Sequence, residues 1–122
     1  MGYNVLVVED DFMNQDLLSE QVEDLAEVQI ASNGAHALQC IQQQKPDLIV
    51  LDLNMPQMNG FQFIEKLRTT GHMIPIVIIT AMDLRRSDYD FFRTHQIARV
   101  FEKGRYSGDE FLTSVRTALQ GG

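Results

Sequence analysis

The sequence predicts an α/β protein in which five parallel strands alternate with five helices, (βα)5, in a doubly wound, flavodoxin-like sheet of strand order 2-1-3-4-5. Short runs rich in valine and isoleucine alternate five times with longer segments of helical periodicity. Three of these runs are apolar throughout, as expected for parallel strands that are covered on both faces. Right-handed crossovers make this strand order the economical arrangement.

Each predicted strand is one of the apolar runs. In chain order the runs are Val5–Val8, Val28–Ala31, Leu48–Leu51, Ile76–Thr80 and Ala98–Glu102. The first, third and fourth are continuously apolar, and we expect them at the centre of the sheet.

Apolar residues recur at helical spacing between these runs. The first three helices are marked by Leu17, Leu18, Val22 and Leu25, by Ala37, Leu38 and Ile41, and by Phe63, Ile64 and Leu67. A fourth helix is expected within Leu84–His95, where the pattern is weak. The last helix has one apolar face, formed by Phe111, Leu112, Val115, Ala118 and Leu119. The segment Ser107–Glu110 has the form of a capping box, and Asp11 is expected to cap the first helix.

Length and composition predict one domain over residues 1–122, because 122 residues with 44% hydrophobic content suffice for a single core. The formal charge of -7 argues against direct binding of this domain to nucleic acid or to an anionic membrane. Cys40 is the only cysteine, so an internal disulfide is excluded and we expect a buried side chain. No segment approaches the roughly 18 apolar residues of a membrane span, and we expect a soluble cytoplasmic domain.

Polar residues stand at the carboxyl ends of the predicted strands, where open parallel sheets bind their ligands. Glu9 and Asp10 follow the first run, Asp52 follows the third, Thr80 ends the fourth and Lys103 follows the fifth. The first and third strands are neighbours in the predicted order, so three carboxylates share one pocket. Their repulsion requires a cation, and hard oxygen ligands favour Mg2+. With a hydroxyl and an ammonium nearby, the pocket is suited to a phosphoryl group, and Asp52 is the candidate nucleophile.

Four segments together resemble the receiver domain of bacterial two-component response regulators over essentially the whole chain. They are "VLVVEDD" at Val5–Asp11, "LIVLDLNMPQMNG" at Leu48–Gly60, "PIVIITA" at Pro75–Ala81 and the lysine of "FEKG", Lys103. No single segment is specific, but their order and spacing are similar to those of the family.

The resemblance implies a role for each site residue. Asp52 would be the phosphoacceptor, and Glu9 and Asp10 would bind Mg2+ (or Mn2+) directly or through water. The backbone carbonyl of Asn54 would complete the metal shell. Thr80 would bond a phosphoryl oxygen of the aspartyl-phosphate and Lys103 would pair with it. The donor would be a sensor histidine kinase or a histidine phosphotransfer protein.

The resemblance also implies a phosphoprotein of a phosphorelay rather than an enzyme that turns over external substrates. Such a domain catalyses its own phosphorylation and dephosphorylation, and thereby switches binding of an effector domain or downstream protein. The alternative is a degenerate receiver that acts as a phosphate-independent interaction module. A phosphorylation-dependent dimer is a further candidate, with a face at Arg85, Arg86 and Arg93, although such charges are usually just solvated.

Two other classes of protein are disfavoured by the site residues. A phosphohydrolase that uses a strand-end aspartate needs a second acid where this chain has Asn54. A flavodoxin-like mononucleotide binder needs a phosphate-cradling loop after the first strand, where this chain has the acidic "EDDFMN".

Three positions depart from the family pattern. Gly104 follows Lys103 where proline is usual, Val100 stands where an aromatic is usual, and Gln96 replaces the usual glycine before the fifth strand. We therefore expect a looser loop around Lys103 and a different readout of the switch. The candidate readout residues are Tyr89, Phe91, Phe92 and Tyr106. In the loop after Asp52, we expect Pro56 to stiffen the backbone and Gly60 to supply conformational freedom.

Overall fold

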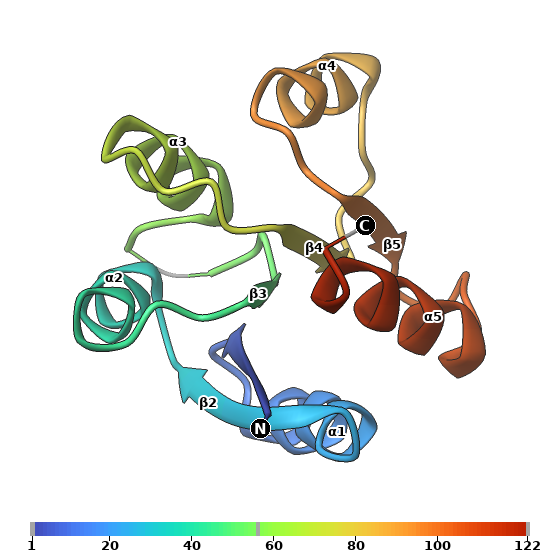
Figure 1. The fold of residues 1–122 in the computed structure, drawn as a ribbon. Helices are drawn as coiled ribbons and strands as arrows, with labels where there is room; N and C mark the ends of the chain where they lie inside the picture. Colours follow the sequence, from blue (N-terminus) through green and yellow to red (C-terminus); the bar gives the residue numbers. More distant parts are fainter. Residues whose placement is uncertain (1, 56, 122) are drawn as a thin grey trace.

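The computed structural model describes residues 2–55 and 57–121, in which five strands alternate with five helices (Figure 1). The strands are β1 (Tyr3–Val8), β2 (Ala26–Ala31), β3 (Leu48–Leu51), β4 (Ile76–Thr80) and β5 (Arg99–Glu102). The helices are α1 (Phe12–Val22), α2 (Gly34–Gln43), α3 (Gly60–Thr69), α4 (Arg86–Thr94) and α5 (Gly108–Leu119). The expectation for Pro56 lies outside the described residues.

The strands form one parallel sheet in the order β2-β1-β3-β4-β5, which confirms the predicted topology. The register aligns the carboxyl ends of the central strands, since Val8 of β1 pairs with Ala31 of β2 and with Leu51 of β3. The residues that follow Val8 and Leu51 therefore emerge side by side at one edge of the sheet.

The two faces of the sheet carry separate hydrophobic clusters. Leu6, Ile49 and Ile78 belong to the cluster covered by α2, α3 and α4, whereas Val7, Val50 and Val77 belong to the cluster covered by α1 and α5. Figure 1 shows this three-layer arrangement, with α1 and α5 on one side of the sheet. Because both faces are covered, both sets of alternating side chains must be apolar, and this explains the uninterrupted apolar runs.

Helix α1 differs from its predicted pattern. Leu17 is 55% exposed, and Leu25 lies beyond the end of the helix. The buried side chains of α1 are Gln15, Leu18 and Val22, so a polar residue takes a core position that the apolar pattern did not reveal. Strand β2 also starts two residues earlier than predicted, because alternate side chains of this edge strand are exposed.

Side-chain caps start several of the helices. Asp11 accepts a hydrogen bond from the backbone N–H of Asn14 and caps α1, as predicted. Ser107 and Glu110 form the predicted capping box of α5, with each side chain bonded to the backbone N–H of the other residue. These bonds satisfy N–H groups that would otherwise lack partners at the start of a helix.

Gly60 is needed for space rather than for conformational freedom, which corrects the sequence interpretation. It is the first residue of α3, and a Cβ atom placed on it would lie 2.6 Å from Cα and 2.7 Å from Cδ2 of Leu53. Only glycine lets the helix start this close to the chain that follows Asp52.

Among the described residues, no helix is long and apolar enough to cross a membrane. Cys40 is a free thiol and is buried in the cluster beneath α2, as expected.

Candidate functional site

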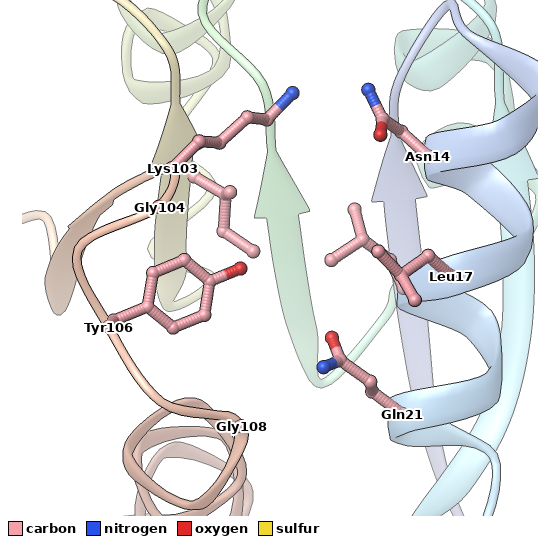
Figure 2. A pocket seen from close by; sticks show the side chains of 9 residues that line it. Asn14, Leu17, Gln21, Lys103, Gly104, Tyr106 and Gly108 are labelled. Atoms are coloured by element: carbon pink, nitrogen blue, oxygen red, sulfur yellow. The ribbon is translucent and has the colours of Figure 1, made fainter.

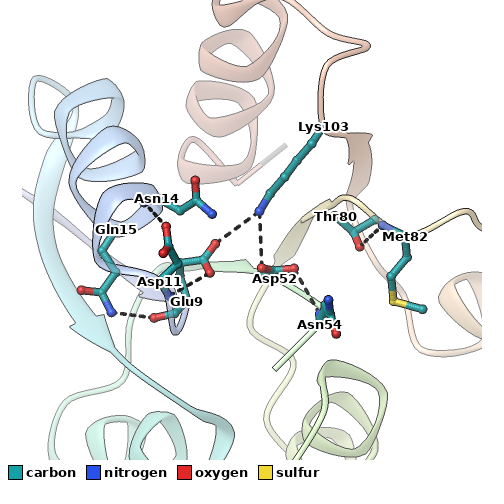
Figure 3. Close-up of polar contacts among 9 residues, drawn as sticks. All are labelled: Glu9, Asp11, Asn14, Gln15, Asp52, Asn54, Thr80, Met82 and Lys103. Atoms are coloured by element: carbon teal, nitrogen blue, oxygen red, sulfur yellow. Dashed lines mark hydrogen bonds and ion pairs between the residues drawn. The ribbon is translucent and has the colours of Figure 1, made fainter. Parts of the chain in front are cut away.

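The carboxyl edge of the sheet fixes the backbones of two acidic residues. The N–H of Glu9 donates to the carbonyl of Ala31 at 3.0 Å, and the N–H of Asp52 donates to the carbonyl of Val8 at 3.0 Å. Both bonds continue the pairing of β1 with its two neighbours. The side chains of Glu9 and Asp52 consequently face one another across the ends of β1 and β3 (Figure 3).

Three carboxylates meet at this edge, as the strand order predicted. Glu9, Asp10 and Asp52 each offer an oxygen, and these oxygens all lie within 4.8 Å of one another. Glu9 and Asp52 are only 1% and 6% exposed, whereas Asp10 is exposed. Two of the three negative charges are thus largely removed from water, which is unfavourable unless cations compensate them.

Lys103 provides one such cation. Its Nζ atom lies 3.4 Å from Oδ2 of Asp52 and 3.6 Å from Oε1 of Glu9. The backbone N–H of Lys103 donates to the carbonyl of Thr80 at 2.8 Å, so the ends of β4 and β5 are tied together beside the site. Gly104 has φ +82°, a conformation that proline cannot adopt and that favours glycine.

The other carboxylate oxygens of Glu9 and Asp52 are not equally supplied with hydrogen-bond donors. Oδ1 of Asp52 accepts from the N–H of Asn54 at 3.1 Å, and Oε2 of Glu9 accepts from the N–H of Asp11 at 3.2 Å. Oε1 of Glu9 is buried and has no hydrogen-bond partner among the described residues. Burial, reinforced by the charge of Asp52, raises the pKa of Glu9 to about 7, although the N–H of Asp11 and the charge of Lys103 oppose this.

The cluster fits a divalent cation. Three carboxylates face a single ammonium, and the buried Oε1 of Glu9 lacks a donor. A hard cation with oxygen ligands would neutralise the excess charge and coordinate this oxygen, and Mg2+ prefers such ligands. The predicted contribution of the Asn54 carbonyl stays a prediction.

Thr80 ends β4 and is fully buried. Its Oγ1 accepts a hydrogen bond from the N–H of Met82 at 3.1 Å (Figure 3). The hydroxyl is thus engaged with the backbone of the loop that leads to α4.

Sequence reasoning missed Gln15. Its Nε2 donates to the carbonyl of Glu9 at 2.7 Å, and the side chain is 5% exposed, so it fixes the backbone that presents Glu9. A signal was present, because Gln15 shares the spacing of a buried helical face with Leu18 and Val22.

A cavity of about 300 Å³ lies beside Lys103, between α1 and the loop that follows β5 (Figure 2). Leu17 of α1 lies on one side of the cavity and Tyr106 lies opposite it, and Leu18 is a further lining residue. Phe12 and Met13, near the start of α1, are 79% and 80% exposed. Apolar surface of this extent beside a polar site is typical of a contact region for another molecule.

The fold and the site together define a class of flavodoxin-like α/β proteins that gather acidic residues at the strand ends. The chain belongs to the response regulator receiver domain family, whose pattern matches residues 5–102. The match ends one residue before Lys103.

Relatives of known name support this membership. The chain is 36% identical over 87 residues to a protein-glutamate methylesterase/protein-glutamine glutaminase of a Nocardioides species, covering 69% of this chain and 24% of the relative. It is 36% identical over 84 residues to the response regulator MprA of Mycobacterium ulcerans, covering 68% of this chain and 36% of the relative. The chain therefore spans about a quarter to a third of the length of these relatives.

Solved structures share the fold. A CheY-like response regulator receiver domain protein from Methanospirillum hungatei matches with a TM-score of 0.89 at 20% identity, covering 99% of this chain and 96% of the other. The chemotaxis protein CheY4 of Vibrio cholerae matches with a TM-score of 0.85 at 24% identity, covering 97% and 99%.

Proposed function

We propose that the domain accepts a phosphoryl group on Asp52 from a phosphohistidine donor in a Mg2+-dependent reaction. The observation that carries this proposal is the position of the Asp52 carboxylate. It is buried at the end of β3, within 3.4 Å of the Lys103 ammonium and grouped with two further carboxylates. The arrangement provides a fixed nucleophile and balancing charges for a transferred phosphoryl group.

In the proposed reaction, a carboxylate oxygen of Asp52 attacks the phosphorus of phosphohistidine. A P–O bond forms, the P–N bond breaks, and the imidazole leaves with the electron pair. Hydrolysis of the acyl phosphate by water returns the carboxylate and inorganic phosphate. Lys103 would pair with a phosphoryl oxygen in place of Asp52, and the Thr80 hydroxyl would donate to another. Bound by Glu9, Asp10 and Asp52, Mg2+ (or Mn2+) would neutralise the charge of the phosphoryl oxygens.

The donor would be a sensor histidine kinase or a histidine phosphotransfer protein. The exposed apolar side chains of Phe12, Met13 and Leu17 lie on α1 beside the site, and they support docking of such a protein there. Ala81, which follows Thr80, is small and exposed, and leaves room for an incoming imidazole. Phosphorylation would alter partner binding on the face formed by α4, β5 and α5.

Intact mass after incubation with Mg2+ and a small phosphodonor tests the proposal. We expect one added phosphoryl group on the wild type, none on Asp52→Asn, and none when Mg2+ is removed by a chelator. The matched control is Asp24→Asn, which changes an exposed aspartate between α1 and β2 and should be labelled like the wild type.

Labelling that persists at the same level in Asp52→Asn would overturn Asp52 as the acceptor. A wild type that gains no mass with small donors or with any histidine-phosphorylated protein would favour the phosphate-independent interaction module.

A further inference from the structure

Helix α4 is attached to the sheet by few side chains. Phe92 is its only buried residue. The C-terminal end of the helix is additionally held by Arg68, whose Nε donates to the carbonyl of His95 at 2.8 Å. The same guanidinium donates to the carbonyls of His72 and Ile74, both at 2.9 Å, so this end is fastened to the segment between α3 and β4.

The N-terminal half of α4 is held differently. The hydroxyl of Tyr89 donates to Oε2 of Glu102, the last residue of β5, at 3.3 Å. The Tyr89 ring packs edge-on against Phe92, with the ring centroids 5.8 Å apart. Glu102 is also within 3.7 Å of Arg105, an exposed residue that does not contact α4 through this pair. Loss of the Tyr89 hydrogen bond would therefore weaken the attachment of this half of the helix to β5, while Arg68 still held the other end.

Two contacts connect the N-terminal half of α4 to the site: one through Glu102 and one through the loop that precedes the helix. Glu102 immediately precedes Lys103, whose ammonium lies against Asp52. The loop before α4 is held by the hydrogen bond from the N–H of Met82 to Oγ1 of Thr80 (Figure 3). Rotation of the Thr80 side chain toward a new oxygen on Asp52 would carry Oγ1 away from the N–H of Met82, and movement of Lys103 with the new charge would displace the end of β5.

We propose that the Tyr89–Glu102 hydrogen bond is a latch that holds the N-terminal half of α4 against β5 and opens when Asp52 is phosphorylated. This inference rests on the proposed function and names the contact through which helix α4 would respond to phosphorylation. Val100, which precedes Glu102 by two residues on the same face of β5, has no ring that could move in its place.

The tyrosines give a direct readout, because the chain has three tyrosines and no tryptophan. Protein labelled with 3-fluorotyrosine should give three 19F resonances, assigned by single Tyr→Phe changes. Glu102→Ala sets the position of the unlatched Tyr89 signal. Arg105→Ala, which removes only the ion pair of Glu102, is the matched control and should leave the Tyr89 signal in place. Tyr3, at the start of β1 and 41% exposed, is the internal reference.

After incubation with Mg2+ and a small phosphodonor, we expect the Tyr89 resonance to move toward its Glu102→Ala position while the Tyr3 resonance stays. Intact mass of the same sample records whether a phosphoryl group was added. Added mass with an unmoved Tyr89 signal overturns the latch and leaves the proposed function standing. No added mass contradicts the proposed function, and with it the trigger of the latch.

Two variants test the coupling from the other direction. Thr80→Val removes the acceptor for the N–H of Met82, and it should move the Tyr89 signal in unphosphorylated protein; an unmoved signal overturns the link through Thr80. Tyr89→Phe removes one hydrogen bond that favours the latched state, so the open state becomes more populated and the variant should accept the phosphoryl group about two- to tenfold faster than wild type. A rate equal to that of wild type and of Tyr3→Phe contradicts the latch.

Discussion

Gln96 is held in a backbone conformation that suits glycine. Its φ is +58°, in the left-handed region, just after the C-cap of α4. A side chain in this region costs about 1 kcal/mol. Glycine avoids this cost but loses about 0.5 kcal/mol more conformational entropy on folding, so a small net gain is left. We therefore expect Gln96→Gly to stabilise the protein by about 0.5 kcal/mol, measured by urea denaturation.

Gln120 supplies the matched control for this change, because it caps the C-terminus of α5 with a φ of -82°. Gln120→Gly should bring no gain in stability. Equal losses of stability in both variants would show that the left-handed backbone at Gln96 is not a source of strain.

At the scale of the residue, the sequence predicts most of the candidate site. Glu9, Asp10, Asp52 and Lys103 follow strands whose order can be inferred, and the structure brings them together. The role of Gln15 was not predicted, since an amide in a helix is normally exposed and its bond to the Glu9 carbonyl depends on tertiary packing.

The start of α3 depends on the close approach of Gly60 to Leu53. A methyl group at position 60 would lie 2.6 Å from a backbone atom that cannot turn aside, so helix and loop must separate. We expect Gly60→Ala to destabilise the protein by roughly 2 kcal/mol in thermal or urea unfolding, as overpacking of a core usually does.

Gly108 is the matched control, because it also begins a helix. A Cβ atom there would meet only Nε2 of Gln21, at an ordinary 3.7 Å. Gly108→Ala should be neutral or slightly stabilising. Similar losses from both substitutions would contradict the steric account of Gly60.

At the scale of the element, the success of prediction follows burial. β3 and β4 are buried at every residue, and their apolar runs were located with the observed bounds. α1 was predicted less well because exposed apolar residues interrupt its pattern: Leu17 faces outward while Gln15 faces the core. α4 is short and mostly polar and buries one side chain, so few apolar residues mark its place in the sequence.

The stability of the whole metal-free protein should fall as the pH rises through the pKa of Glu9. Burial raises the pKa of Glu9 from 4.5 to about 7, so above pH 4.5 the folded state retains a proton that the unfolded state loses. The stability that Glu9 contributes is complete below about pH 4.5 and is lost as the pH rises through about 7. A difference of this size corresponds to roughly 3 kcal/mol in the free energy of unfolding.

Chemical denaturation with a chelator present, from pH 4.5 to pH 8, checks this expectation. The stability of wild type relative to Glu9→Gln should decline across the range, whereas the difference from Glu27→Gln, a change of an exposed glutamate on β2, should stay constant. Addition of Mg2+ at pH 8 should stabilise the wild type by mass action. If the stability difference between wild type and Glu9→Gln did not change with pH, Glu9 would ionise freely in the folded protein.

The strand order of the whole molecule was predictable because a right-handed (βα)5 chain has few alternatives. This order also distributes the polar cluster over four strands, with Glu9, Asp52, Thr80 and Lys103 at the ends of β1, β3, β4 and β5. A nascent, truncated or misregistered chain cannot assemble these groups. Completed folding is thus a precondition of the proposed phosphoryl acceptance, and incompletely folded molecules would not be phosphorylated.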